Sequence, residues 1–134
     1  MVAAGQRVRK TEYTDLLGLW IGLIDVVREI DSETLRARLG DSESGPLLVD
    51  IRTPEEVAQG TIPLATHIPM HLLPLCLHEL PRDREVVLYC RSGARSYHAC
   101  QYLAQQGLEN MINLRGGIIA WARHGFEIGS LQRG

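Results

Sequence analysis

One short segment of the sequence combines a nucleophile with groups that bind anions. It consists of Cys90, Arg91, Ser92, Gly93, Ala94, Arg95 and Ser96. The thiolate of a cysteine is a strong nucleophile, and neighbouring positive charges lower the pKa of the thiol so that the thiolate is populated at neutral pH. Gly93 lets the backbone bend so that successive N–H groups point inward at an anion. The segment predicts Cys90 as the catalytic nucleophile and the six residues after it as the substrate-binding loop.

The elements on either side of this loop predict where it lies. Residues 86–89, Val-Val-Leu-Tyr, have the character of a central strand that ends directly before Cys90. A helix is expected from about Ala94 to Gln106, with Gly107 ending it. Ligand sites in parallel sheets lie at the carboxyl ends of strands, and helix N-termini offer free N–H groups to anions. Cys90 is therefore expected both at the carboxyl end of a strand and beside a helix N-terminus.

The rest of the chain alternates short β-branched runs with helical segments. This alternation predicts an α/β domain with a parallel sheet covered by helices. Thr53, Pro54 and Glu56 form a helix start with a capping box, and Gly60 is expected to close that helix. The other expected strands are residues 47–50, 65–68 and 111–114, and the other expected helices are residues 32–39, 71–80 and 118–124.

Length and composition limit the classes of protein. A chain of 134 residues with 45% hydrophobic and 22% charged residues fits one compact globular domain. Fourteen basic and sixteen acidic side chains give a net charge of -2, which lacks the basic character of nucleic-acid-binding proteins. No nucleic-acid partner is expected. Three cysteines do not form a disulfide framework, so a reducing compartment, the cytoplasm, is expected.

The N-terminal part of the chain contains an apolar run at residues 16–24. Nine residues are too few to span a bilayer. Glu12 and Asp15 precede the run and no small-residue cleavage site follows it, which argues against a signal peptide. Membrane insertion is not expected. Residues 1–28 are instead predicted to be a helical extension that packs on the domain or joins a second copy in a homodimer.

Three segments of the sequence together resemble the single-domain rhodaneses, a family of thiosulfate-type sulfurtransferases. They are residues 48–56 with 60–69, the loop at residues 90–96, and residues 113–118 with Trp121. The resemblance covers about Ile30 to Ile128 and predicts a rhodanese domain over residues 29–130. Thr61 and Leu64 stand where the family usually has His and Gly, in a segment whose role looks structural.

The resemblance implies a mostly parallel five-stranded sheet with helices on both faces, and sulfur transfer in two steps. The Cys90 thiolate takes the outer sulfur of a small anionic donor such as thiosulfate, releases sulfite, and carries the sulfur as a persulfide. A thiol, cyanide or a sulfur-acceptor protein then collects it. Arg91 and Arg95 would bind the donor's anionic end, while Asp50 and Arg52 would orient the loop or the segment behind it. No metal and no organic cofactor are implied.

Two other functions remain open on this fold. The related phosphatases and arsenate reductases have a loop one residue longer than the four residues that separate Cys90 from Arg95. The shorter ring suits a single sulfur atom rather than a tetrahedral oxyanion. A rhodanese-like module that binds partners without turnover is the second alternative, and the presence of Cys90 argues against it.

The remaining cysteines have simpler interpretations. Cys100 follows Cys90 by ten residues, on the order of 10 Å along a helix, which is too far for a disulfide. A small buried core residue is expected there. Cys76, His71 and His78 suggest a metal site, but prolines break the helical register that would align them. Scattered surface histidines are expected instead.

The segment at residues 71–80 contains more leucine than one helix face buries. Burial in the core is the expected explanation. Contact with an acceptor protein or a second subunit near the active loop is the alternative.

Overall fold

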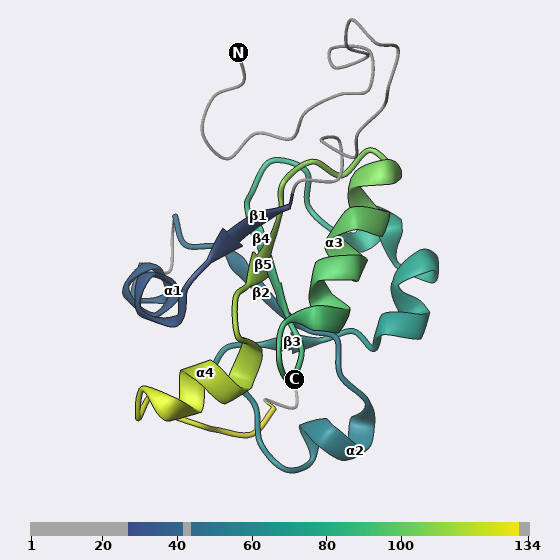
Figure 1. The fold of residues 1–134 in the computed structure, drawn as a ribbon. Coiled ribbons are helices and arrows are strands. Elements are labelled where there is room, and N and C mark those ends of the chain that lie inside the picture. Colours follow the sequence, from purple (N-terminus) through teal and green to yellow (C-terminus); the bar gives the residue numbers. More distant parts are fainter. Residues whose placement is uncertain (1–26, 42–43, 132–134) are drawn as a thin grey trace, which may run out of the picture.

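The computed structural model describes residues 27–41 and 44–131 and contains one sheet (Figure 1). The strands are β1 (Arg28–Ile30), β2 (Leu47–Asp50), β3 (Thr66–His67), β4 (Val86–Tyr89) and β5 (Met111–Leu114). The order across this five-stranded sheet is β1-β5-β4-β2-β3, and every neighbouring pair runs parallel. The predicted α/β fold class is confirmed.

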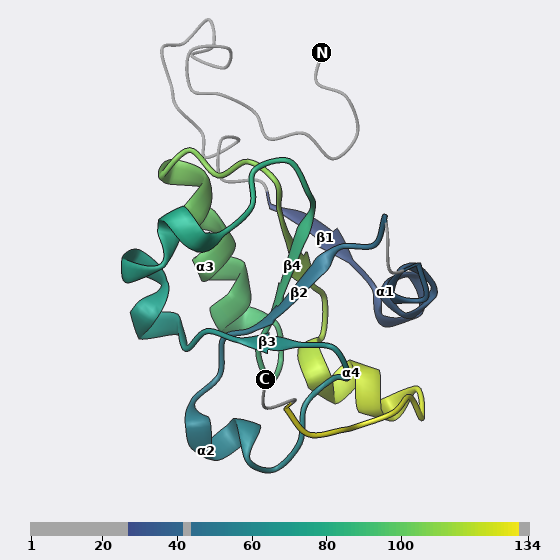
Figure 2. The ribbon, with the colours of Figure 1, turned by 180° about the vertical axis from the view of Figure 1, so that it is seen from behind.

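Helices cover both faces of the sheet. They are α1 (Ser32–Leu39), α2 (Pro54–Val57), α3 (Ala94–Gln105) and α4 (Gly117–Arg123), together with the 3-10 helices η3 (Met70–Leu75) and η4 (Leu77–Glu79). The opposite views of Figures 1 and 2 show α1 and α4 on one face and α3 with the 3-10 helices on the other. Within the described residues, no helix is long and apolar enough to cross a membrane.

The central strand β4 supplies side chains to both faces. Val86, Leu88 and Cys90 belong to the core beneath α3, whereas Val87 and Tyr89 belong to the core beneath α1 and α4. This alternation follows from the two-residue side-chain period of a strand. All four residues of β4 are 0% exposed. Cys90 therefore follows a strand that is fixed by packing on both sides.

The first strand, β1, was not among the strands that the sequence predicted. It is three residues long and its middle residue, Glu29, is exposed, so the apolar pattern is weak. It joins the sheet because it pairs with β5 at the edge. Arg28, the last residue of the predicted extension, lies within this strand. Residues 1–26 lie outside the described residues, so the helical extension and its role in a homodimer remain predictions.

The helix predicted at residues 71–80 is wrong. Two short 3-10 helices occupy this region, and Pro74 lies inside the first of them. Proline lacks an N–H donor and its ring clashes with the preceding turn, which prevents a continuous α-helix. Leu73 and Leu80 are buried, whereas Leu75 is 70% exposed. Only part of the leucine-rich segment joins the core.

Candidate active site

Cys90 lies at the start of the predicted loop, between the end of β4 and the first turn of α3. Its Sγ accepts hydrogen bonds from the Gly93 N–H at 3.1 Å and from the Ser96 hydroxyl at 3.5 Å. Gly93 has φ +99, a left-handed conformation that favours glycine, and it precedes α3 without a side-chain cap. The N–H groups at the start of α3 are therefore available to an anion in the loop.

The surroundings of Cys90 change its pKa in opposite directions. Burial acts to raise the pKa, because the residue is 1% exposed. Hydrogen bonds from the Ser96 hydroxyl and from the N–H groups of Ser96, Gly93 and Ser92 outweigh burial, so the pKa of the Cys90 thiol is lowered. The sequence predicted that arginine charge would lower this pKa in addition to the N–H groups at the helix start. In the structure these hydrogen bonds are the larger contributions.

The N-terminus of α4 holds the loop from outside. The Ile118 N–H donates to the Cys90 carbonyl at 3.0 Å, and the Ile119 N–H donates to the Arg91 carbonyl at 3.1 Å. Gly117 makes this approach feasible, since a Cβ there would lie 2.4 Å from the Arg91 oxygen and 2.6 Å from the Cys90 oxygen. With these carbonyls directed at α4, the loop N–H groups can face the sulfur. In the sequence, Gly117 belongs to the segment 113–118 that resembles the rhodaneses, and its contact with the loop was not predicted.

A two-point ion pair connects the loop to α2. Arg95 Nη1 and Nη2 donate to Glu56 Oε1 and Oε2 at 2.9 and 2.8 Å. The capping box between Thr53 and Glu56, predicted from the sequence, is confirmed and fixes the carboxylate. Hydrogen bonding to Arg95 is the main reason that the pKa of Glu56 falls to about 2. Glu56 was expected only as part of a cap, and its position opposite the loop arginine was not predicted.

The buried pair of Asp50 and Arg52 lies behind this connection. Arg52 Nε and Nη2 donate to the Asp50 carboxylate at 2.9 and 2.7 Å, with side chains only 7% and 0% exposed. Arg52 Nη2 also donates to the Gly60 carbonyl at 2.7 Å. The pair thus connects the end of β2 to the segment after α2. Its predicted orienting role would act through that segment and Glu56 rather than by contact with Cys90.

The other predicted loop residues lie at the surface. Arg91, Ser92 and Ala94 are exposed, and Ser92 contributes its backbone N–H rather than its side chain to the sulfur. Contacts of these side chains with a substrate remain predictions. Cys100 is buried, as expected, and burial raises the pKa of its thiol. It therefore lacks the activation that Cys90 has.

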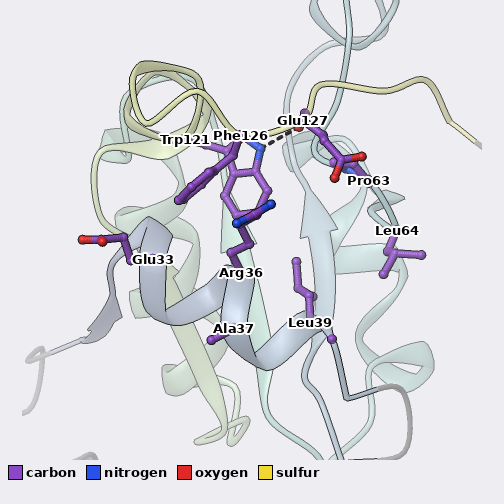
Figure 3. Close-up of a pocket in the computed structure, with 10 residues that line it drawn as sticks. Glu33, Arg36, Ala37, Leu39, Pro63, Leu64, Trp121, Phe126 and Glu127 are labelled. Carbon is purple, nitrogen blue, oxygen red and sulfur yellow. Dashed lines mark hydrogen bonds between the residues drawn. The ribbon is translucent and has the colours of Figure 1, made fainter.

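Two features of the described residues lie outside this site. A cavity of about 570 Å³ opens between α1 and α4, where Arg36 lies over the Phe126 ring with Trp121 and Leu64 nearby (Figure 3). None of residues 90–96 lines this cavity. Among the described residues, no group of three or more His, Cys, Asp or Glu side chains is placed to hold a metal ion.

The parallel sheet and its cysteine loop give the described residues a rhodanese fold, and comparison with known proteins gives the family. Residues 31–124 match the rhodanese-like domain, and the chain belongs to this family. A sulfurtransferase from Allochromatium vinosum is 65% identical over 103 residues, covering 77% of this chain and 95% of the relative. The putative sulfurtransferase YtwF from Bacillus subtilis is 40% identical over 95 residues, covering 71% and 90%.

A solved structure gives the same result. The crystal structure of a rhodanese-like domain protein from Staphylococcus aureus has a TM-score of 0.68 at 35% identity, covering 78% of this chain and 100% of that chain. The predicted family and fold are confirmed. The named relatives support sulfurtransferase activity in general.

Proposed function

We propose that this chain is a thiosulfate-type sulfurtransferase in which Cys90 carries the sulfur as a persulfide. The observation that carries the proposal is the convergence of loop N–H groups and the Ser96 hydroxyl on Cys90 Sγ. In the first step the thiolate attacks the outer sulfur of a donor such as thiosulfate. A bond forms from Sγ to that sulfur, the donor's S–S bond breaks, and sulfite leaves with its electron pair.

The second step returns the enzyme to its starting state. A nucleophilic acceptor, which is a thiol, cyanide or a sulfur-carrier protein, attacks the outer sulfur of the persulfide. The S–S bond to Cys90 breaks and the Cys90 thiolate leaves with the electron pair. The loop that stabilises the thiolate therefore also makes it a good leaving group.

The loop has the size and charge for this chemistry. Cys90 is 1% exposed, so only a small end of a donor can reach its sulfur. The N–H groups at the start of α3 would hold the negative outer sulfur of the persulfide. Arg91 is exposed, and Arg95 uses two of its five N–H groups on Glu56. Both arginines can receive the sulfonate end of thiosulfate.

The proposed reaction sets conditions on its surroundings. Cys90 and the donor supply both reacting sulfur atoms, so the scheme requires neither a metal nor an organic cofactor. The thiolate must stay reduced between turnovers, which fits the cytoplasm. A donor, an acceptor thiol and a partner protein that delivers or accepts sulfur are therefore proposed as its partners.

Intact-protein mass spectrometry tests the proposal directly. The reduced protein is incubated with thiosulfate and then washed with a thiol. The expected result is a gain of one sulfur atom that the wash reverses. Cys90→Ser should abolish the gain, and Cys100→Ser, the matched control at a buried cysteine, should keep it. A gain that persists in Cys90→Ser, or no gain in a folded wild-type protein, would contradict the proposal.

A further inference from the structure

The hydroxyl of Ser96 has one hydrogen and two acceptors. Ser96 is 0% exposed, so no solvent competes for this hydroxyl. Its Oγ lies 2.5 Å from Asn113 Oδ1 and 3.5 Å from Cys90 Sγ. Because a hydroxyl donates a single hydrogen bond, Ser96 cannot serve the amide oxygen and the sulfur fully at the same time.

The orientation of the Asn113 amide follows from its other partners. Asn113 lies on β5 and is 1% exposed. Its Nδ2 donates to Glu29 Oε2 at 2.8 Å and to the Gly93 carbonyl at 3.2 Å. Both partners are acceptors, so both N–H groups of the amide are used and Oδ1 must face Ser96. The acceptor opposite the hydroxyl is thus fixed by strand β1 and by the loop itself.

We infer that Asn113 is a positioning residue that competes with the Cys90 sulfur for the single hydroxyl proton of Ser96. When the sulfur is a neutral thiol, the shorter distance directs the proton to Asn113. When the sulfur becomes a thiolate, the hydroxyl turns to Sγ and the bond to Asn113 is given up. Asn113 therefore limits how strongly the loop stabilises the thiolate, which keeps the sulfur more nucleophilic.

The competition also distinguishes the two states of the proposed cycle, and this step rests on the proposed function. In the thiolate the negative charge lies on Sγ, where Ser96 can bind it. In a persulfide the charge lies on the outer sulfur, where backbone N–H groups bind it, and Sγ no longer needs the hydroxyl. Ser96 can then return to Asn113. The Asn113 bond is thus lost in the thiolate and kept in the persulfide, which favours sulfur loading.

The ionisation of Cys90 also depends on the charges around it. Arg91 and Arg95 lie on the loop and on α3, the Asp50 and Arg52 pair lies at the end of β2, and Glu29 acts through Asn113. His67 on β3 is a further titratable group, and its ring contacts the Arg52 carbonyl at 2.7 Å. Replacing Asn113 also removes the donor to Glu29 and to the Gly93 carbonyl. This loss is the same with and without the Ser96 hydroxyl, so it cancels when the effect of the replacement is compared between the two Ser96 backgrounds.

The test is the rate at which Cys90 is alkylated, measured against pH with no sulfur donor and followed at the Cys90 peptide by mass spectrometry. Asn113→Leu has a similar size but no acceptor, so it frees the Ser96 proton for the thiolate. The expected result is a roughly three- to tenfold faster alkylation at about pH 6, where the thiolate fraction limits the rate. In a Ser96→Ala background the same change should give no increase.

Comparing the effect of Asn113→Leu with Ser96 present and in the Ser96→Ala background separates a positioning role of Asn113 from a purely structural one. An increase of equal size in both backgrounds, or no increase with Ser96 present, would overturn the inference. If Asn113→Leu does not fold, Asn113→Val, which is smaller, suits a strand and also lacks an acceptor, takes its place. It should speed alkylation with Ser96 present and give no increase in the Ser96→Ala background. Equal increases in the two backgrounds, or no increase with Ser96 present, would overturn the inference.

A loading experiment addresses the persulfide step separately. At a fixed ratio of thiosulfate to sulfite, Asn113→Leu should carry less sulfur than the wild type, and equal loading would overturn this step. The alkylation experiment uses no sulfur donor. A protein that shows the Ser96-dependent effect but never gains sulfur would therefore contradict the proposed function and leave the proton competition standing.

Discussion

Glu56 and Arg95 form a two-point ion pair that joins two helix starts 39 residues apart in sequence, with N–O distances of 2.9 and 2.8 Å. Glu56 belongs to the capped first turn of α2, and Arg95 belongs to the first turn of α3. The segment with Asp50 and Arg52 fixes the far side of α2. The loop arginine is therefore held by a chain of contacts that begins at the end of β2.

Replacing the Glu56 carboxylate by an amide should lower the free energy of unfolding. It should also remove the part of the pH dependence of stability that Glu56 contributes. We expect Glu56→Gln to lower the free energy of unfolding by about 1 to 2 kcal/mol at neutral pH, a value reduced for solvent screening of a partly exposed pair. Urea unfolding of the wild type and the variant measures this difference. The matched control is Glu55→Gln, which changes an exposed neighbour in the same helix turn.

The sign of the pH dependence follows from the direction of the shift. The pKa of Glu56 is lowered from its ordinary value of 4.5 to about 2 in the folded protein. A lowered carboxyl pKa adds stability above the unfolded pKa, and this stability is lost as the pH falls through the folded pKa. The difference in the free energy of unfolding between wild type and Glu56→Gln should therefore stay constant above the ordinary pKa of 4.5 and narrow as the pH falls from there toward about 2. A gap that stays constant with pH would show that the charge contributes nothing.

Arg95→Ala should weaken the use of anionic donors and raise the pKa of the Cys90 thiol. The change removes a positive charge near the sulfur and leaves the Glu56 carboxylate without its partner. We expect the KM for thiosulfate to rise about tenfold, because one charged hydrogen-bonding group is lost. Steady-state kinetics over a range of thiosulfate concentrations measures this effect.

Two controls isolate the role of the arginine. The double variant Arg95→Ala with Glu56→Gln removes both charges, so the thiol pKa should return toward that of the wild type while the KM stays high. Arg95→Ala should raise the KM for an uncharged trisulfide donor less than it raises the KM for thiosulfate. Unchanged kinetics with thiosulfate would show that Arg95 does not bind the donor.

Much of this architecture follows from local sequence patterns. Strand β4 could be predicted because its four apolar residues are buried on both faces, and the capping box at Thr53 could be predicted because it is complete within four residues. The loop at Cys90 was predictable for the same reason, since a strand, a glycine and a helix start follow one another directly.

The contacts between distant segments could not be predicted in the same way. Nothing near Glu56 indicates that its carboxylate meets Arg95, and nothing near Asn113 indicates that its amide meets Glu29 and Ser96. These contacts depend on strand order, which places β2 beside β4 for the first contact, and β1 beside β5 and β5 beside β4 for the others. Strand β1 itself is too short to show a period. Gly117 lies in a segment that resembles the family, but nothing near it in the sequence indicates that it approaches the carbonyls of Cys90 and Arg91.

Gly117→Ala should damage the loop without touching Cys90. A Cβ at this position would lie 2.4 and 2.6 Å from the carbonyl oxygens of Arg91 and Cys90, so the loop or α4 must move. We expect a loss of about 2 to 3 kcal/mol in the free energy of unfolding, together with slower alkylation of Cys90.

Gly125→Ala is the matched control for the backbone contribution. Gly125 has φ +76, also in the left-handed region, but a Cβ there would meet nothing within 4 Å. Gly125→Ala should lower the free energy of unfolding by about 1 kcal/mol and leave the alkylation rate of Cys90 unchanged. Equal effects of the two variants on alkylation would show that the contact of α4 with the loop does not shape the sulfur site.

Leu64→Gly should stabilise the protein although it removes a leucine. Leu64 has φ +74, and no other non-glycine residue among those described has a positive φ. Its side chain is 69% exposed at the rim of the cavity in Figure 3, so little burial offsets this strain. We expect the free energy of unfolding to rise by about 0.5 to 1 kcal/mol. The backbone strain that is relieved exceeds the free-energy cost of the extra entropy that glycine loses on folding.

Leu75→Gly separates this effect from the loss of an exposed leucine. Leu75 is 70% exposed and lies in the 3-10 helix η3, where φ is not positive. Glycine relieves no strain there, so we expect a loss of about 1 kcal/mol. In thermal and urea unfolding, the Tm and the free energy of unfolding should therefore rise for Leu64→Gly and fall for Leu75→Gly. If both destabilise the protein equally, the contacts of Leu64 with the cavity rim outweigh its backbone strain.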